Sequence, residues 1–248
     1  MDELGFEPPT ISGIGLEENL EWNRQRWGQR AGWVDKDSYG YNWGGNFEQD
    51  PGRMAQLADT FLRPFLPARW DLVVLEISPG AGRFTAELIR LSKHFVGVDI
   101  NQAAIDICRE RFKYYPGEIT WHRNDGRTLA CVERNDFDLI ASYDSMVHMH
   151  PEVVASYINE SARLLGRGGL LWIDHSGRGV QEQAHRTDVT AELARESGRA
   201  AGLAPVAQIW RNDWDCISVF RKPETGPAAG GLSPEEIRRT RESGLGCR

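Results

Sequence analysis

Residues 73–84 read Val73-Val74-Leu75-Glu76-Ile77-Ser78-Pro79-Gly80-Ala81-Gly82-Arg83-Phe84. An apolar run leads directly into a glycine-rich turn, and a helix-forming segment follows. A continuous apolar run is typical of a strand that is buried on both faces of a parallel sheet. Glycines permit positive φ and let the backbone approach a ligand closely. The segment therefore predicts a ligand site at the carboxyl end of a parallel strand.

Strands and helices alternate around this turn. The pattern predicts strands at 72–77, 95–100, 119–122, 138–142, 169–174, 206–210 and 216–221, and helices at 84–92, 102–112, 151–165 and 191–201. Such alternation predicts an α/β fold with a doubly wound, mostly parallel sheet. The last two strands are separated by a few residues only, so we expect a closing hairpin in which one strand runs antiparallel.

The segment before the first strand is rich in aromatic residues. We expect helices at 16–31 and 53–65, with a loop at 33–46 between them. The chain then divides into an N-terminal helical cap and lid (1–69), a core domain (70–222) and a polar tail (223–248) with a short helix at 233–242. We expect Trp22 and Trp27 to pack the first helix onto the sheet, and Tyr39 to Trp43 to lie nearer the site.

The composition of the chain argues against several kinds of partner. The 248 residues carry a net charge of -7 without a long Lys/Arg run, which argues against a nucleic-acid partner. The apolar runs are strand-length, so no membrane span is expected. The four cysteines, Cys108, Cys131, Cys216 and Cys247, are scattered, which argues against a zinc site or a disulfide framework and favours the cytoplasm. The oligomeric state is not indicated.

Two acidic positions follow the next two strands. Asp99 ends the second strand about twenty residues after the glycines, where a carboxylate can accept both hydroxyls of a ribose. Asn124-Asp125-Gly126 follows the third strand, and a carboxylate there can bind an exocyclic amine such as adenine N6. The turn has Thr85 in place of the third glycine of the dinucleotide fingerprint, which weakens a nicotinamide interpretation.

Together these segments resemble the successive motifs of class I, Rossmann-like S-adenosylmethionine-dependent methyltransferases over roughly residues 70–222. The resemblance implies a seven-stranded sheet of order 3-2-1-4-5-7-6 with strand seven antiparallel. It also implies S-adenosyl-L-methionine as cofactor. The cofactor-binding residues that we expect are Glu76, Ser78, Gly80, Ala81, Gly82, Asp99, Ile100, Asn124, Asp125, Gly126, Ser142 and Tyr143.

The resemblance assigns roles to several of these residues. Gly80 and Gly82 would pass beside the methionine part of the cofactor, and Glu76 would lie near its amino group. Asp99 would hold the ribose. Asp125 would hold the adenine amine, and Ser142 the methionine end. Pro79 departs from the usual small residue and lacks an N–H, so one backbone contact is lost.

The methyl acceptor should lie over the loop that follows the fourth strand, residues 142–150. An oxygen nucleophile must lose a proton, and a positioned histidine or carboxylate assists this step. We expect His148 as the general base and Asp144 as the group that orients it or the substrate, with His175 as the alternative base. A structural role for His148, and a helix-capping role for His150, remain the competing interpretation.

A metal-dependent interpretation uses some of the same residues. Asp144 and Asp174-His175 resemble the layout of catechol-type O-methyltransferases, in which an acid follows strand four and an Asp-Asn pair follows strand five. Mg²⁺ prefers oxygen ligands, so His175 in place of asparagine argues against a bound metal.

The stretches 22–30 (WNRQRWGQR) and 39–45 (YGYNWGG) resemble bacterial sugar O-methyltransferases, such as those of mycobacterial methylmannose polysaccharide synthesis. The acceptor that this resemblance implies is a hydroxyl of an oligosaccharide or a glycosylated small molecule. Alternatives are an N-methyltransferase, an O-methyltransferase of a non-sugar natural product, a nicotinamide oxidoreductase, and a non-catalytic cofactor-binding partner.

Overall fold

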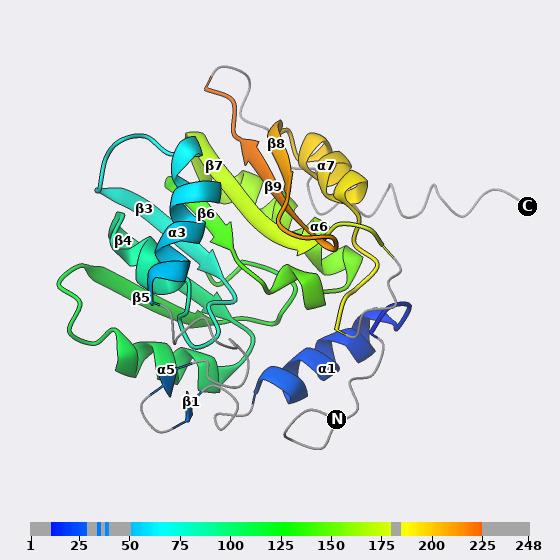
Figure 1. Cartoon of the computed structure of the whole chain (residues 1–248), viewed down its shortest axis with the longest axis horizontal. Coiled ribbons are helices and arrows are strands. Elements are labelled where there is room, and N and C mark those ends of the chain that lie inside the picture. The colour runs from blue at the N-terminus through cyan, green and yellow to red at the C-terminus, as the bar shows by residue number, and fades with distance from the viewer. Residues whose placement is uncertain (1–10, 29–33, 36–37, 40–50, 180–184, 225–248) are drawn as a thin grey trace, which may run out of the picture.

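The computed structural model of the chain describes residues 11–28, 34–35, 38–39, 51–179 and 185–224 (Figure 1). A seven-stranded sheet has the order β5-β4-β3-β6-β7-β9-β8. Its strands are β3 (Leu72–Ile77), β4 (Ser92–Asp99), β5 (Glu118–Arg123), β6 (Phe137–Ser142), β7 (Leu165–Ser176), β8 (Ala204–Trp210) and β9 (Asp215–Arg221). All neighbouring strands pair in parallel except β9, which is antiparallel to both β7 and β8. The predicted order 3-2-1-4-5-7-6 is confirmed.

Helices cover both faces of this sheet (Figure 1). They are α1 (Leu16–Trp27), α3 (Pro51–Phe61), α4 (Thr85–Ile89), α5 (Gln102–Arg111), α6 (Pro151–Leu164) and α7 (Ala191–Ala200), with 3₁₀ turns η2 (Arg63–Phe65) and η3 (Met146–His148). One core packs α6 and α7 against the sheet, and a second packs α3 and α4 against the opposite face.

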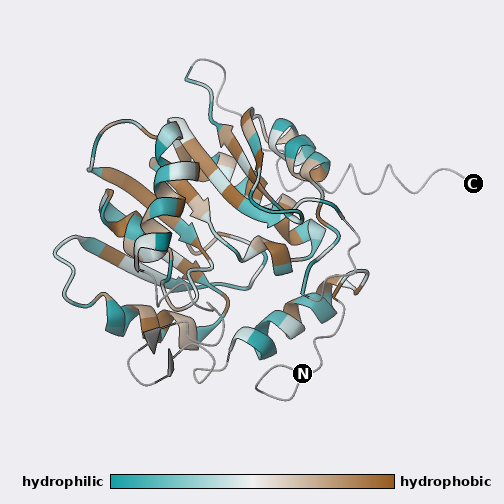
Figure 2. Ribbon diagram, in the orientation of Figure 1, coloured by the Kyte–Doolittle hydropathy of each residue, from teal (hydrophilic) through white to brown (hydrophobic). Residues whose placement is uncertain are grey.

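Strand β3 explains the apolar run in the sequence. Val73, Leu75 and Ile77 point into the core under α6, while Leu72 and Val74 point into the core under α3. A strand between two helical layers has no solvent-facing side, so every position is apolar except Glu76, at the ligand end. Figure 2 shows the same brown, apolar colouring along the central strands.

The element boundaries differ from the prediction mainly at β7. The strand begins at Leu165 and ends at Ser176, because it pairs with Phe137 of β6 at one end and with Asp215 of β9 at the other. The expected loop at 33–46 contains two short antiparallel strands, β1 (Val34–Asp35) and β2 (Ser38–Tyr39). The expected helix at 233–242, Tyr41 and Trp43 lie outside the described residues.

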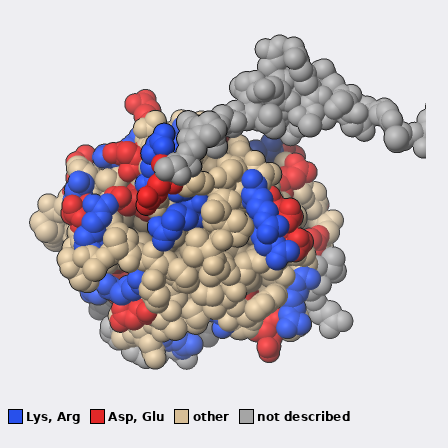
Figure 3. Space-filling view, turned by 90° about the horizontal axis from the view of Figure 1, so that it is seen from above, with Lys and Arg blue, Asp and Glu red and all other residues tan. Residues whose placement is uncertain are grey.

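The surface of the described part of the chain carries charges of both signs. On the face shown in Figure 3, Lys and Arg side chains lie in clusters beside Asp and Glu side chains, around a broad area of other residues. Within the ranges given above, no helix combines the length and the apolar character that a membrane span requires. Cys108, Cys131 and Cys216 are free thiols, and Cys247 lies outside these ranges.

Candidate active site

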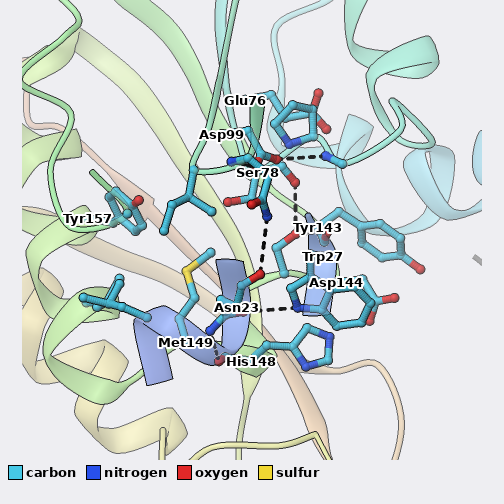
Figure 4. Close-up of a pocket in the computed structure, with 18 of the residues that line it drawn as sticks. Asn23, Trp27, Glu76, Ser78, Asp99, Tyr143, Asp144, His148, Met149 and Tyr157 are labelled. Carbon is cyan, nitrogen blue, oxygen red and sulfur yellow. Dashed lines mark hydrogen bonds between the residues drawn. The ribbon is translucent and has the colours of Figure 1, made fainter. Parts of the chain in front are cut away.

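The carboxyl ends of β3, β4 and β6 open into one pocket, and α1 forms a further wall (Figure 4). The turn after β3 contributes Ser78, Pro79, Gly80, Arg83 and Phe84. The remaining lining residues are Asn19, Leu20, Asn23, Trp27, Glu76, Asp99, Ile100, Asn101, Gly126, Tyr143, Asp144, Ser145, His148, Met149, Val153 and Tyr157. The pocket therefore lies where parallel α/β sheets bind ligands.

The turn after β3 is held in an unusual backbone conformation. Ser78, Gly80 and Gly82 have φ of 58°, 56° and 81°, and a left-handed conformation is uncommon for a serine. The N–H of Ser78 donates to the Val98 carbonyl at 2.7 Å, and its carbonyl accepts from the Ser145 hydroxyl at 3.0 Å. The turn is thus tied to β4 and to the loop after β6.

Gly82 and Ala81 do not line the pocket, contrary to our expectation. A Cβ on Gly82 would lie 2.5 Å from the Phe112 ring, so the glycine is required by packing against the end of α5. Ala81 is buried, with 1% of its surface exposed. The glycine pair therefore shapes the turn, and only Gly80 faces the pocket.

Asp99 lies at the pocket end of β4 and connects two loops. Its Oδ1 accepts from the Asn101 N–H at 2.8 Å, and its Oδ2 accepts from the Gly80 N–H at 3.2 Å. Burial raises the pKa of Asp99 to about 6, although these N–H groups oppose the shift. Each carboxylate oxygen has a further lone pair, so Asp99 can still accept hydrogen bonds from a ligand.

Glu76 lies deeper in the same pocket. The Thr85 hydroxyl donates to its Oε2. Burial raises the pKa of Glu76 to about 8, and the nearby Asp99 contributes to this rise. Near pH 7 the uncomplexed protein therefore carries a mostly protonated Glu76.

Three predicted cofactor residues lie outside the pocket. Asp125 is exposed and caps its own loop, since its Oδ1 accepts from the backbone N–H groups of Arg127 and Thr128, both at 2.8 Å. The Asn124 amide donates to the hydroxyl of Tyr157 at 2.9 Å. The Ser142 hydroxyl donates to the Ile77 carbonyl at 2.9 Å. These three side chains instead form hydrogen bonds within their loop, to α6 or between neighbouring strands.

Helix α1 contributes a wall that sequence reasoning only partly foresaw. Asn19, Asn23 and Trp27 line the pocket, and their spacing of four residues places them on one face of the helix. The Trp27 indole donates to Asn23 Oδ1 at 3.1 Å. We had expected a packing role for Trp27, but it lies on the pocket wall. The four-residue spacing was the signal that could have identified all three residues.

His148 faces the pocket beside Trp27, with ring centroids 4.9 Å apart. Its Nδ1 lies 2.5 Å from the His185 carbonyl oxygen, so Nδ1 carries the proton and Nε2 keeps a lone pair. Burial lowers the pKa of His148 to about 4, and the nearby Arg186 adds to this effect. The imidazole is therefore neutral at physiological pH and can accept a proton at Nε2.

Asp144 is an ion-paired carboxylate. Arg83 Nη2 lies 2.8 Å from its Oδ2, and Arg211 Nη2 lies 2.9 Å from its Oδ1. Burial alone would raise the pKa of Asp144, but the two guanidinium groups lower it to about 2. Both guanidinium groups also lie 5.2 Å from the Tyr143 ring centroid. Asp144 is therefore a fixed anion that holds Arg83 and Arg211 around Tyr143.

An arginine joins the two acids of the metal-dependent interpretation, Asp144 and Asp174. Arg211 lies between the two acids, with its Nε 3.1 Å from Asp174 Oδ2 and its Nη2 2.9 Å from Asp144 Oδ1. In the described part of the chain, no group of three or more His, Cys, Asp or Glu side chains is placed to hold a metal ion.

His175 does not fit the predicted role of alternative base. It is fully buried, its Nδ1 is 2.5 Å from the Ser176 carbonyl oxygen, and its Nε2 is 2.8 Å from the Ser218 hydroxyl. It does not line the pocket, because it belongs to β7 inside the sheet, where it pairs with Cys216 of β9.

Comparisons with known proteins agree with this architecture. Residues 74–169 match the family model for a methyltransferase domain. The biotin biosynthesis bifunctional protein BioHC of Cellvibrio japonicus (strain Ueda107) is 30% identical over 133 residues, which cover 53% of this chain and 24% of that protein. The chain thus spans about a quarter of the length of this curated relative.

Solved structures share the fold along most of the chain. The N-methyltransferase NodS from Bradyrhizobium japonicum WM9, in complex with S-adenosyl-L-homocysteine, has a TM-score of 0.61 at 21% identity and covers 83% of this chain and 100% of its own. Magnesium protoporphyrin IX methyltransferase from Synechocystis PCC 6803, with the same compound bound, has a TM-score of 0.57 at 14% identity, with coverages of 82% and 99%. The fold is that of the class I methyltransferases.

Proposed function

We propose that this protein is an S-adenosylmethionine-dependent methyltransferase that acts on a hydroxyl of a saccharide or a glycosylated small molecule. The observation that carries the proposal is a single pocket that joins Asp99 and the left-handed turn to the neutral imidazole of His148. In this proposal residues 70–222 form the catalytic domain, and residues 1–69 form its cap.

The pocket contains groups suited to each part of the cofactor. Asp99 accepts hydrogen bonds from the ribose hydroxyls. Glu76 faces the positively charged amino group. Leu20, Ile100, Met149 and Val153 give an apolar surface for a flat base. The cofactor supplies a methyl group on a positively charged sulfur.

His148 and Trp27 act on the acceptor. In-line methyl transfer depends mainly on orientation of the nucleophile, at about 3 Å from the methyl carbon. His148 Nε2 takes the proton that the acceptor hydroxyl loses. Trp27 offers an apolar ring face, a surface that suits a sugar ring.

An amine acceptor is the second candidate, and one observation favours it. A histidine whose pKa is about 4 is a weak base, and a weak base suits an acceptor that loses its proton more readily than a hydroxyl does. NodS, which shares the fold, is an N-methyltransferase.

Calorimetric titration with S-adenosyl-L-homocysteine tests the cofactor assignment, with NAD as the control ligand. We expect micromolar binding of the first compound and none of the second. Binding of NAD alone would replace the methyltransferase proposal with an oxidoreductase. Methyl transfer from labelled cofactor to matched sugars and amino sugars then tells hydroxyl acceptors from amine acceptors, and a lack of turnover on every acceptor supports a non-catalytic cofactor-binding protein.

A further inference from the structure

Two buried asparagines on α1 connect the cap to the acceptor loop. Asn19 and Asn23 are 1% and 9% exposed, and their Nδ2 groups both donate to the same acceptor, the His148 carbonyl oxygen, each at 3.0 Å. Asn19 Oδ1 accepts from the His150 N–H at 2.9 Å. Figure 4 shows Asn23 and His148 joined in this way. The backbone on both sides of Met149 is thus fixed by one helix.

The same two side chains also bond to each other and to Trp27. Asn23 Nδ2 lies 3.2 Å from Asn19 Oδ1, and Asn23 Oδ1 accepts from the Trp27 indole. The Trp27 ring packs against the imidazole of His148. The amide pair therefore holds His148 at its backbone, and through Trp27 it also fixes one face of the ring.

Helix α1 reaches the cofactor end of the pocket as well. The Asn101 amide donates to the Asn23 carbonyl at 3.3 Å, and Asn101 is also the residue whose N–H binds Asp99. A displacement of α1 therefore disturbs both the loop after β4 and the loop that carries His148. One face of α1 therefore contacts both the cofactor end and the acceptor end of the pocket.

We propose that Asn19 and Asn23 are positioning residues that hold His148 in its pocket-facing orientation and couple that orientation to the docking of α1 on the cofactor pocket. The inference rests on the proposed function, in which His148 takes the acceptor proton. It goes beyond that function because neither asparagine is needed to touch the acceptor or the methyl group.

The double variant Asn19→Ala/Asn23→Ala tests the proposal, and Gln25→Ala is the matched control. Gln25 lies on α1 and bonds to Glu21 at the exposed surface. The readout is the titration of the His148 ring, followed by NMR with isotope-labelled histidine and assigned with His148→Gln. The groups that face this ring are Asp144, Arg186 and His185, and all three are unchanged in the variants.

We expect the pKa of His148, near 4 in the parent protein, to rise by at least about one unit toward its ordinary value in the double variant, because the loop becomes hydrated. Gln25→Ala should titrate like the parent. At saturating substrates, a rise of one unit should lower the kcat of the double variant about twofold more at pH 5 than at pH 8, and a rise of two units about tenfold more. A uniform loss of folded protein does not produce this pH dependence.

An unchanged His148 titration in a folded double variant would overturn the proposal. If the double variant does not fold, Asn23→Ala alone decides by the same readout, since Asn19 still donates to the carbonyl: a pKa equal to that of the parent counts against the proposal, and a raised pKa supports it. The titration does not require methyl transfer. A failure of the proposed function, seen as absent S-adenosyl-L-homocysteine binding by the parent protein, is therefore a separate result.

Discussion

Asp99 and Asp125 are both acids that follow strands, yet the structure separates their roles. Asp99 is buried in the pocket, while Asp125 caps an exposed loop. We expect Asp99→Ala to weaken S-adenosyl-L-homocysteine binding by about tenfold or more, because hydrogen bonds to a charged group contribute about 1.5–3 kcal/mol. Asp125→Ala should change binding by less than about threefold. Calorimetry measures both, and equal losses would return Asp125 to the adenine site.

His148 carries the prediction for turnover. His148→Gln should lower kcat on a hydroxyl acceptor by about 10²-fold or more, since this is the usual contribution of a positioned base. Affinity for S-adenosyl-L-homocysteine should stay close to that of the parent. His122→Gln, on the edge strand β5, is the control. A loss of less than about tenfold would argue against the base role, and would favour an amine acceptor.

The residues that sequence reasoning placed correctly at the pocket follow strand ends directly. Glu76, Ser78, Gly80 and Asp99 are at or next to the carboxyl ends of β3 and β4. Side-chain direction separates the other expected residues from the pocket, as for Ser142, whose hydroxyl donates to the Ile77 carbonyl of the neighbouring strand. Direction depends on pairing and on loop conformation, which local sequence does not specify.

The hairpin of β8 and β9 supplies Arg211 to the site, and a buried carboxylate anchors it. Asp215 is fully buried and bonds to Arg186 at 2.7 and 3.0 Å and to Arg211 at 2.8 Å. Asp215→Ala leaves two guanidinium groups without this partner, so we expect a loss of about 3–5 kcal/mol in the free energy of unfolding. The exposed Asp213 gives the control, Asp213→Ala. Denaturant unfolding measures both, and similar stabilities would show that the cluster is not stabilising.

The sequence predicts a helix or strand well where the apolar pattern of its own residues defines it. The buried run of β3 matched at both ends, because the core on each side requires it. The predicted strand was too short at both ends of β7, because pairing with β6 and β9 holds the outer residues of the strand. Helix α1 was predicted, but its contact with His148 was not, because the spacing of residues in a helix shows which of them share a face and not which loop that face contacts.

At the scale of the whole molecule, buried ionisable groups make stability depend on pH. Burial raises the pKa of Glu76 to about 8, of Asp174 to about 7 and of Asp99 to about 6. A carboxyl group whose pKa is raised in the folded state keeps its proton to a higher pH there than in the unfolded chain. The protein therefore loses stability as the pH rises from the pKa of the unfolded chain to the pKa of the folded state.

Two histidines, His148 and His175, change the stability with pH in the opposite direction, and they do so at lower pH. Burial lowers the pKa of His148 and His175 to about 4 from an ordinary value of 6.5. The unfolded chain therefore binds more protons at these sites between pH 4 and 6.5, and stability rises with pH across that window. The contribution of the two histidines is complete about one unit above pH 6.5, where the unfolded chain has released these protons.

We therefore expect the melting temperature to fall as pH rises from 6.5 to 8.5, with Glu76 as a main cause. Glu76→Gln keeps the shape and hydrogen bonds of the protonated side chain but does not ionise, so its melting temperature should exceed that of the parent by a margin that widens from pH 5 to 8.5. Glu133→Gln, at an exposed position, should run parallel to the parent. Thermal denaturation across this range measures the margin. A constant margin would mean that Glu76 ionises as readily in the folded protein as in the unfolded chain, so that the pocket contains more water than its burial indicates.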